Sequence, residues 1–415
     1  MPFTIIKKDK KTKARLGLLK TPHGTVKTPA YVFVGTYGRF LHLTPKDLKK
    51  AATQIVIANT FHLWQKALEN KISEGFIHKS FGLKIPIMTD SGGFQVLSLA
   101  FGDKNKVGKF MTGDRDSNLP ASGFARPIGT LSEQAPADLA EYKRTKIKIN
   151  QKGVYFTYDG KKRFLGPELS MDLQSKIGAD IMFAFDCITS PLDDYDYNKK
   201  ALELTNKWAK ICLTEHAKLQ KPRKNKQMLY GIVQGGVYPD LREESAKAIG
   251  AMPFDGFGIG GSYTKEQIAA ALGRVTPHLP EEKPRHLLGV GKVADVFEAV
   301  EQGMDTFDCV IPTREARHGR LYTRQGTIDI RQGKHTVKTI IEKGCKCPTC
   351  AAKVSKEKIR ELIKSQDRIL NAKGQRYCLM HNMWFFNTLL EEIRAALARG
   401  SYRSYKTKFL KKFSA

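Results

Sequence analysis

The sequence contains no apolar run that approaches the ~18 residues a membrane-spanning helix needs. We expect no export signal either, because the first residues, MPFTIIKKDKKTKARLG, carry charges where a signal peptide needs an apolar stretch. We therefore expect a cytoplasmic protein without a membrane partner.

Acidic residues are scarce relative to basic ones. The 415 residues include 41 Asp and Glu but 70 Lys and Arg, so the formal net charge at pH 7 is +29. This excess favours a polyanionic partner. Neither a strongly amphipathic helix nor a lipidation signal points to a membrane, so nucleic acid is the leading partner class. Solubility alone is the other interpretation of the charge.

Cysteine is sparse, but four of the seven cysteines lie between Cys345 and Cys378, which fits metal binding better than a disulfide framework. Cys345, Cys347 and Cys350 are close enough in sequence to surround one ion, and His381 can complete a tetrahedral Cys3His set. Such a set leaves no open position for catalysis, so we expect one structural Zn²⁺ per chain. A disulfide and idle thiols are the metal-free alternatives. Two other side chains compete for the fourth position: Cys378 and, more weakly, His335.

Short β-type runs recur along the first three quarters of the chain, and most lead through a Gly-rich or polar cluster into a helix-compatible segment. Eight such strands separated by helices indicate an α/β fold, a closed parallel (β/α)8 TIM barrel. An open doubly wound sheet would show the same alternation. The predicted strands are residues 31–34, 54–58, 85–89, 181–185, 229–233, 257–259, 286–288 and 306–311.

Other parts flank or interrupt the barrel, which we assign to residues 31–335. Residues 1–30 are expected to form an antiparallel lid, and residues from about 100 to 145 an insertion without clear periodicity. A hairpin is predicted to turn at Asp159-Gly160. Residues 336–400 are assigned to the inserted zinc-binding subdomain and its closing helices, 354–370 and 384–399. Residues 401–415 form a basic tail that could wrap phosphate or simply be solvated.

Polar residues cluster where the predicted strands end, and in a TIM barrel these ends share one rim, where active sites lie. Taken singly, such an Asp can cap a helix and such a Gly can turn the chain. Together they suit a planar hydrogen-bonding ligand such as a purine, and two carboxylates suit retaining exchange at a sugar carbon. The residues are Asp90, Asp186, Gln234, Gly260, Gly261 and Asp308.

An ordered set of motifs closely resembles the tRNA-guanine transglycosylases, the queuine tRNA-ribosyltransferase family. The resemblance runs from about residue 12 to residue 400, and the order makes it specific although each motif alone is common. The motifs are DSGGFQ at 90–95, GIVQGG at 231–236, IGG at 259–261, LGVG at 288–291, FDCVIPTR at 307–314 and the Cys3His set.

The resemblance implies exchange of guanine at the anticodon wobble position of tRNAs with GUN anticodons for a 7-deazaguanine base. Asp308 matches the nucleophile that holds the ribose covalently, and Asp90 matches the general acid and base. Arg314 and Arg317 match contacts to the flanking nucleotides, with an ion pair to a nearby acid as the plain alternative. We also expect a homodimer. The base-reading positions are Asp186, Gln234 and the backbone of Gly261 and Ser262, and Phe94 and Leu288 sandwich the base.

One departure from the family lies beside the expected 7-substituent, where the chain reads SYTKE at 262–266. Glu266 could pair with the amine of 7-aminomethyl-7-deazaguanine, and we favour this base slightly over queuine. Two alternatives from other classes are a catalytically inert tRNA-binding partner subunit and a metal-dependent hydrolase on the same barrel. Retention of Asp90 and Asp308 speaks against the first, and the missing His-x-His cluster speaks against the second.

Overall fold

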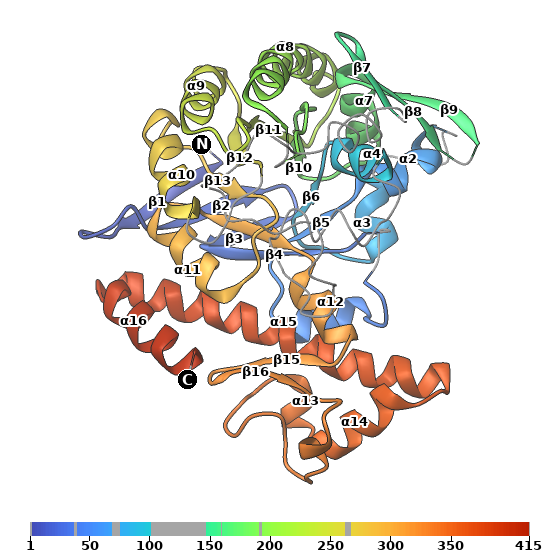
Figure 1. Cartoon of the computed structure of the whole chain (residues 1–415), viewed down its shortest axis with the longest axis vertical. Helices are drawn as coiled ribbons and strands as arrows, with labels where there is room; N and C mark the ends of the chain where they lie inside the picture. The colour runs from blue at the N-terminus through green and yellow to red at the C-terminus, as the bar shows by residue number, and fades with distance from the viewer. Residues whose placement is uncertain are drawn as a thin grey trace.

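The computed structural model describes residues 2–36, 40–68, 75–100, 147–158, 160–190, 193–261 and 267–414. Eight parallel strands close into a barrel, in which β14 pairs with β4 to complete the circle (Figure 1). This confirms the predicted TIM barrel. The strands are β4 (Ala30–Val34), β5 (Val56–Ala58), β6 (Ile87–Thr89), β10 (Ile181–Phe183), β11 (Met228–Val233), β12 (Gly256–Ile259), β13 (Arg285–Leu287) and β14 (Thr306–Cys309).

The strands read as continuous apolar runs because both of their faces are buried. Alternate residues point to opposite faces of a strand. On β4, Val32 therefore joins the cluster inside the barrel, whereas Phe33 joins the cluster between strands and outer helices. On β10, Phe183 and Met182 divide in the same way.

Helices surround the barrel between successive strands (Figure 1). The helices are α1 (Pro45–Lys50), α2 (Thr60–Leu68), α3 (Phe76–Phe81), α4 (Gly93–Ala100), α7 (Pro167–Ile177), α8 (Tyr195–Gln220), α9 (Pro239–Gly250), α10 (Gln267–Val275), η1 (Thr276–His278), α11 (Val293–Glu301) and α12 (Ile311–Arg317).

Two antiparallel sheets accompany the barrel. The first, β1 (Phe3–Lys8), β2 (Arg15–Thr21) and β3 (Gly24–Thr28), packs Leu19 and Val26 into the cluster inside the barrel. It covers the end at which the strands begin, since Arg15 pairs with Asp305 immediately before β14. The second contains β7 (Ile147–Asn150), β8 (Gly153–Tyr158) and β9 (Lys161–Leu165). Beyond residue 100, the predicted insertion lies outside the described residues. Of the predicted hairpin turn, residue 159 also lies outside them, whereas residue 160 is described.

The C-terminal part lies beside the barrel and is joined to it by one long helix (Figure 1). This helix, α15, packs on the barrel, where the rings of Phe386 and Tyr31 lie 4.8 Å apart. The predicted helix 354–370 is interrupted because Asp367 caps α15 by accepting hydrogen bonds from Ile369 N and Leu370 N. The elements are β15 (Arg320–Thr323), β16 (Gly326–Asp329), η2 (Gly333–His335), α13 (Pro348–Ala351), α14 (Lys356–Lys364) and α15 (Arg368–Arg399).

The interpretation of residues 401–415 as a tail is wrong for Tyr402–Phe413, which form helix α16. Aromatic side chains recur on one face of this helix, and Phe409 packs on Phe297 of α11 with ring centroids 5.4 Å apart. Lys406 forms ion pairs with Glu298 and Glu301. Residues 401–415 thus contain an apolar helix face that packs on the barrel, although the basic residues among them suggested a tail.

Candidate active site and metal centre

The carboxyl ends of the parallel strands bring the predicted polar residues to one rim of the barrel. Asp90 follows β6, Gln234 follows β11, and Asp308 lies within β14. Asp186 lies three residues after β10, and Gly260 and Gly261 follow β12. This is the end opposite the sheet β1–β3, so the rim remains free of that cover.

Asp90 is held by donors from neighbouring loops. Its Oδ2 accepts from Asn59 Nδ2 at 2.7 Å, and its Oδ1 accepts from the backbone N–H groups of Thr60 at 2.9 Å and Gly92 at 3.1 Å. Burial, assisted by the charges of Asp308 and Asp186, raises the pKa of Asp90 to about 7 against the lowering effect of those backbone hydrogen bonds. Asp90 can therefore exchange a proton near neutral pH.

Asp186 and Gln234 form a buried pair. Gln234 Nε2 donates to Asp186 Oδ2 at 2.6 Å, and Ser91 Oγ donates to Oδ1 at 3.2 Å. Burial raises the pKa of Asp186 to about 6. Gln234 Oε1 is buried without a hydrogen-bond partner among the described residues. An unpaired buried acceptor costs about 1–3 kcal/mol, which a ligand donor would recover.

The turn after β12 requires glycine because a buried arginine lies against it. Arg242 Nη1 donates to Gly260 O at 3.0 Å. Gly261 has a φ of +105°, and a Cβ there would lie 2.2 Å from Arg242 Nη2. Glycine at position 261 therefore lets the turn lie directly on the Arg242 guanidinium. Ser262 and Glu266, the next two predicted site residues, lie outside the described residues.

Asp308 is oriented through one of its oxygens. Its Oδ1 lies 3.1 Å from His286 Nε2 and accepts from the backbone N–H of Gly289 at 3.2 Å. His286 is fully buried on β13, and its Nδ1 lies 2.9 Å from Thr306 Oγ1. The Asp308 side chain is 15% exposed. Among the described residues, these contacts leave Oδ2 of Asp308 as the oxygen available to a ligand.

Two apolar residues predicted to sandwich the base lie near this rim. Phe94 lies on α4, four residues after Asp90, and is partly exposed. Leu288 directly follows β13, is also partly exposed, and packs against the cluster inside the barrel. Their partial exposure is compatible with contact to a planar ligand.

The predicted metal cluster assembles in the C-terminal part. His381 Nδ1 lies 3.9, 3.3 and 3.8 Å from Sγ of Cys345, Cys347 and Cys350. All four donor atoms lie within 4.8 Å of one another. His381 Nε2 lies 2.7 Å from Tyr322 O, which holds the N–H there and directs the Nδ1 lone pair at the sulfurs. Three sulfurs and one imidazole are the donor set of a structural zinc site.

The cluster resolves the competition for its fourth member. His381 belongs to it, whereas Cys378 and His335 do not belong to any of the clusters among the described residues. Cys378 is fully buried on the same helix and packs in the apolar core of this part. A turn of α15 separates the two side chains and explains why sequence spacing alone left both open.

Known proteins match the chain along nearly its whole length. A family profile described as queuine tRNA-ribosyltransferase matches residues 9–115 and 122–415. The chain belongs to this family. A queuine tRNA-ribosyltransferase of Clostridium perfringens is 37% identical over 424 residues, covering 99% of this chain and 98% of the relative. One of Halothermothrix orenii is 36% identical, with 99% and 97% covered, and one of Symbiobacterium thermophilum is 36% identical, with 100% and 92% covered.

Membership of the queuine tRNA-ribosyltransferase family directs attention to the arginines beside the site. Arg314 and Arg317 lie on α12, directly after β14, and neither forms an ion pair within the described part of the chain. Arg314 lines a groove of about 510 Å³ between α12 and the β15–β16 hairpin. Across this groove Arg331 pairs with Asp329 at 2.7 Å. The ion-pair alternative weighed for Arg314 and Arg317 is therefore not what the described residues show.

Sequence reasoning missed two residues that shape the rim of this barrel. His286 was included in a predicted strand but given no role, although a polar side chain in an otherwise apolar strand was the available signal. Arg242 lies on α9 and was given no role, yet it is 2% exposed. No sequence signal places it under Gly261.

In this structure no helix within the described ranges has both the length and the apolar character required to cross a membrane.

Proposed function

We propose that this chain exchanges guanine at the wobble position of tRNA for a 7-deazaguanine base through a covalent Asp308–ribose intermediate. One observation carries the proposal: the rim holds carboxylates in different protonation environments, with Asp308 oriented by two donors and the Asp90 pKa raised to about 7. Retaining exchange at a sugar carbon needs one carboxylate as nucleophile and another as acid and base.

In the first half-reaction, Oδ2 of Asp308 attacks C1′ of the ribose while the bond from C1′ to guanine breaks. Asp90 donates a proton to the departing purine, so guanine leaves as the neutral base and Asp90 becomes ionised. The hydrogen bonds from His286 and Gly289 to Oδ1 persist while Oδ2 forms the ester. This leaves an acylal-type ester between Asp308 and the ribose.

The second half-reaction reverses the roles. Asp90 removes the proton from the ring nitrogen of the incoming base, and that nitrogen attacks C1′ as the ester to Asp308 breaks. Two displacements on the same carbon restore the original configuration. Asp308 is regenerated as a carboxylate and Asp90 as an acid, so no proton is gained or lost over the cycle.

The base is read by the buried pair beside the nucleophile. Gln234 Oε1 would accept a purine N–H, and Asp186 would accept further N–H groups while Gln234 Nε2 orients it. The backbone at Gly261 and the backbone of Ser262 would face the same edge, with Phe94 and Leu288 on the two ring faces. A purine would thus satisfy a buried acceptor that lacks a partner.

The tRNA would be bound along the basic surface next to the rim. Arg314 and Arg317 follow the nucleophile by six and nine residues, and guanidinium groups pair with phosphate and stack on bases. The anticodon loop is single-stranded, which is how proteins reach RNA bases for sequence-specific contact. We propose that zinc, bound by Cys345, Cys347, Cys350 and His381, holds this surface together without taking part in the chemistry.

We propose 7-aminomethyl-7-deazaguanine as the incoming base, with Glu266 pairing with its amine. A charged amine buried without a partner is costly, so a carboxylate at this position suits the small aminomethyl substituent. Competition between the two bases for release of labelled guanine from tRNA tests the choice. A much larger kcat/KM for queuine would reverse it without changing the reaction class.

Incubation of the protein with unmodified tRNA and labelled guanine tests the proposed exchange. Labelled tRNA should accumulate with the wild type and not with Asp308→Asn. Binding of tRNA without any incorporation by the folded wild type would instead identify an inert tRNA-binding subunit. Hydrolytic release of products that stops on addition of a chelator would identify a metal-dependent hydrolase.

A further inference from the structure

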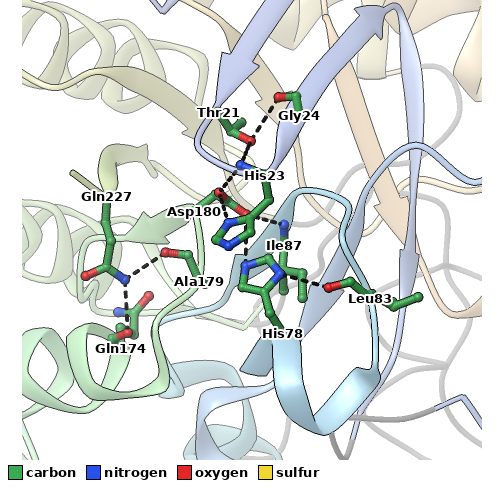
Figure 2. A network of polar contacts seen from close by, with 10 residues as sticks. All are labelled: Thr21, His23, Gly24, His78, Leu83, Ile87, Gln174, Ala179, Asp180 and Gln227. Carbon is green, nitrogen blue, oxygen red and sulfur yellow. Dashed lines mark hydrogen bonds and ion pairs between the residues drawn. The ribbon is translucent and has the colours of Figure 1, made fainter. Parts of the chain in front are cut away.

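A second cluster of metal-ligand residues lies at the end of the barrel opposite the proposed active site. It joins His23 from the turn between β2 and β3, His78 from α3, and Asp180, which directly precedes β10 (Figure 2). Asp180 is fully buried in its side chain, His78 is 8% exposed and His23 is 35% exposed. The cluster therefore faces solvent on the His23 side alone.

Both oxygens of Asp180 are oriented by backbone donors. Oδ1 accepts from the N–H of His23 at 3.2 Å and lies 2.8 Å from His23 Nδ1. Oδ2 accepts from the N–H of Ile87 at 2.9 Å and lies 3.2 Å from His78 Nε2. Figure 2 shows both rings directed at this one carboxylate. Because the carboxylate is fixed, its position does not depend on the imidazoles.

Neither neutral tautomer of His78 satisfies its surroundings. Nδ1 lies 3.4 Å from Leu83 O, and Nε2 lies 3.2 Å from Asp180 Oδ2 but has no aligned hydrogen bond. A proton on Nδ1 leaves the Nε2 lone pair against a carboxylate oxygen, and a proton on Nε2 leaves the Nδ1 lone pair against a carbonyl. A cation between Nε2 and the carboxylate removes this conflict.

The two rings lie next to each other beside this carboxylate. The rings of His23 and His78 stack with centroids 3.4 Å apart and an angle of 21° between their planes. His23 Nδ1 thereby lies at Oδ1 of Asp180 and His78 Nε2 at Oδ2, so one ion can contact both rings and the carboxylate.

We propose that His23, His78 and Asp180 bind one divalent transition-metal ion of the zinc class. Their donor atoms lie within 4.8 Å of one another, and imidazole with carboxylate suits zinc, cobalt or nickel better than calcium or magnesium. Leu83 O behind His78 and the Ile87 N–H behind Asp180 are the outer contacts that orient metal ligands. Water reaching the exposed His23 side supplies the remaining ligand.

The position of this site gives it a structural role. The ion would fasten the β2–β3 turn, which carries His23, to the start of β10 and to α3. Asp180 already links strands there, since its N–H donates to Ile87 O and its carbonyl accepts from Met228 N, both at 2.8 Å. The site would lock the covering sheet to the barrel, away from both the proposed catalytic rim and the Cys3His centre.

Metal stoichiometry of the full-length protein tests this proposal independently of activity. After saturation with Zn²⁺ and dialysis, elemental analysis should find two equivalents per chain in the wild type and one in His23→Ala and His78→Gln. The thermal midpoint should rise on addition of Zn²⁺ in the wild type more than in either variant. His278→Ala is the matched control, because His278 Nε2 lies 3.5 Å from Glu243 without a second imidazole, and it should retain two equivalents.

Co²⁺ added to protein whose Cys3His centre already holds zinc separates the two sites. Binding should give weak visible absorption without the intense thiolate-to-cobalt bands that a Cys3His site produces. His23→Ala removes a side chain from a partly exposed turn, and circular dichroism should confirm that it folds. One equivalent of zinc in the wild type, or two in folded His23→Ala, would overturn the proposal.

Discussion

His286 Nε2 lies 3.1 Å from Oδ1 of Asp308, and Thr306 Oγ1 lies 2.9 Å from the other ring nitrogen of His286. Hydroxyl, imidazole and carboxylate thus form a buried chain that fixes the Asp308 carboxylate. With the Thr306 hydroxyl donating to Nδ1, the ring proton lies on Nε2 and points at Oδ1. The ring of His286 is itself held beside Phe183, with centroids 5.3 Å apart.

Substitution of His286 tests this chain. His286→Phe should lower kcat for base exchange about 10- to 100-fold, since loss of one oriented donor at a reacting group has effects of about this size or larger. The Kd for tRNA should change little. His286→Gln can still donate to Oδ1 and should recover part of the rate. Equal kcat in the wild type and His286→Phe would show that the contact does not orient the nucleophile.

The raised pKa of Asp90 predicts how activity depends on pH. Burial, assisted by the charges of Asp308 and Asp186, moves this pKa from its usual 3.8 to about 7. Asp90 therefore carries its proton below about pH 7, and guanine release, which needs that proton, should slow above it. Single-turnover release of guanine from labelled tRNA measures the effect. A rate that stays constant from pH 6 to pH 8.5 would contradict the assignment.

The free energy of unfolding should also depend on pH through Asp90. A carboxyl whose folded pKa is raised favours the folded state when protonated, so this contribution declines as pH rises from about 4 to about 7. Asp90→Asn cannot ionise and escapes the decline. The thermal midpoint of Asp90→Asn relative to the wild type should therefore increase across this range. A difference that does not depend on pH would argue against the raised pKa.

Removal of the metal from the Cys3His centre should unfold its surroundings and leave the barrel folded. A closed site contributes local folding energy, so chelation should expose residues from about 340 to 385 to hydrogen exchange and weaken tRNA binding. His381→Ala should lose the metal and Cys378→Ser should keep it. The opposite result for these two variants would replace the fourth ligand.

The lysines of helix α16 fall into two groups, one paired with acids of the barrel and one exposed and available to RNA. Lys406 is neutralised by Glu298 and Glu301, whereas Lys408, Lys411 and Lys412 are exposed. Replacing these three by Gln should reduce the salt dependence of tRNA binding, and Lys406→Gln should leave it unchanged. If the salt dependence of tRNA binding is unchanged in the triple variant, the three lysines do not contact the tRNA.

The apolar face of α16 makes a separate prediction. Phe409 is 8% exposed and packs on Phe297 and Phe385, so Phe409→Ala should lower the free energy of unfolding by about 3 kcal/mol. Denaturant unfolding measures this change. Thr407→Ala, at an exposed position of the same helix, is the control. Equal stability of the two variants would indicate that the helix is not fastened to the barrel.

The sequence was most informative where one physical requirement dominates. Strands buried on both faces must be apolar, so all eight barrel strands could be predicted, with end errors of one or two residues. The predicted strand 306–311 ended two residues too late, because Ile311 begins α12 and its β-branched side chain resembles the strand before it. The Cys3His cluster followed from residue types whose chemistry leaves few alternatives.

Contacts between distant residues were beyond the sequence pattern. Arg242 and Gly261 meet because α9 folds back on the turn after β12, which periodicity does not show. His23 and Asp180 are 157 residues apart and meet at the end of the barrel. In α16, lysines alternate with the aromatic residues, so the apolar face of this helix was not recognised from the sequence. Such relationships depend on tertiary packing, which a local pattern does not encode.

The covalent intermediate tests the central claim most directly. Wild-type protein mixed with tRNA and a competing base should give a species on a denaturing gel that contains both, and mass spectrometry of its peptides should place the ribose on Asp308. Asp308→Asn should bind tRNA with similar affinity and form no such species. A ribose on Asp90, or undiminished exchange by Asp308→Asn, would contradict the account.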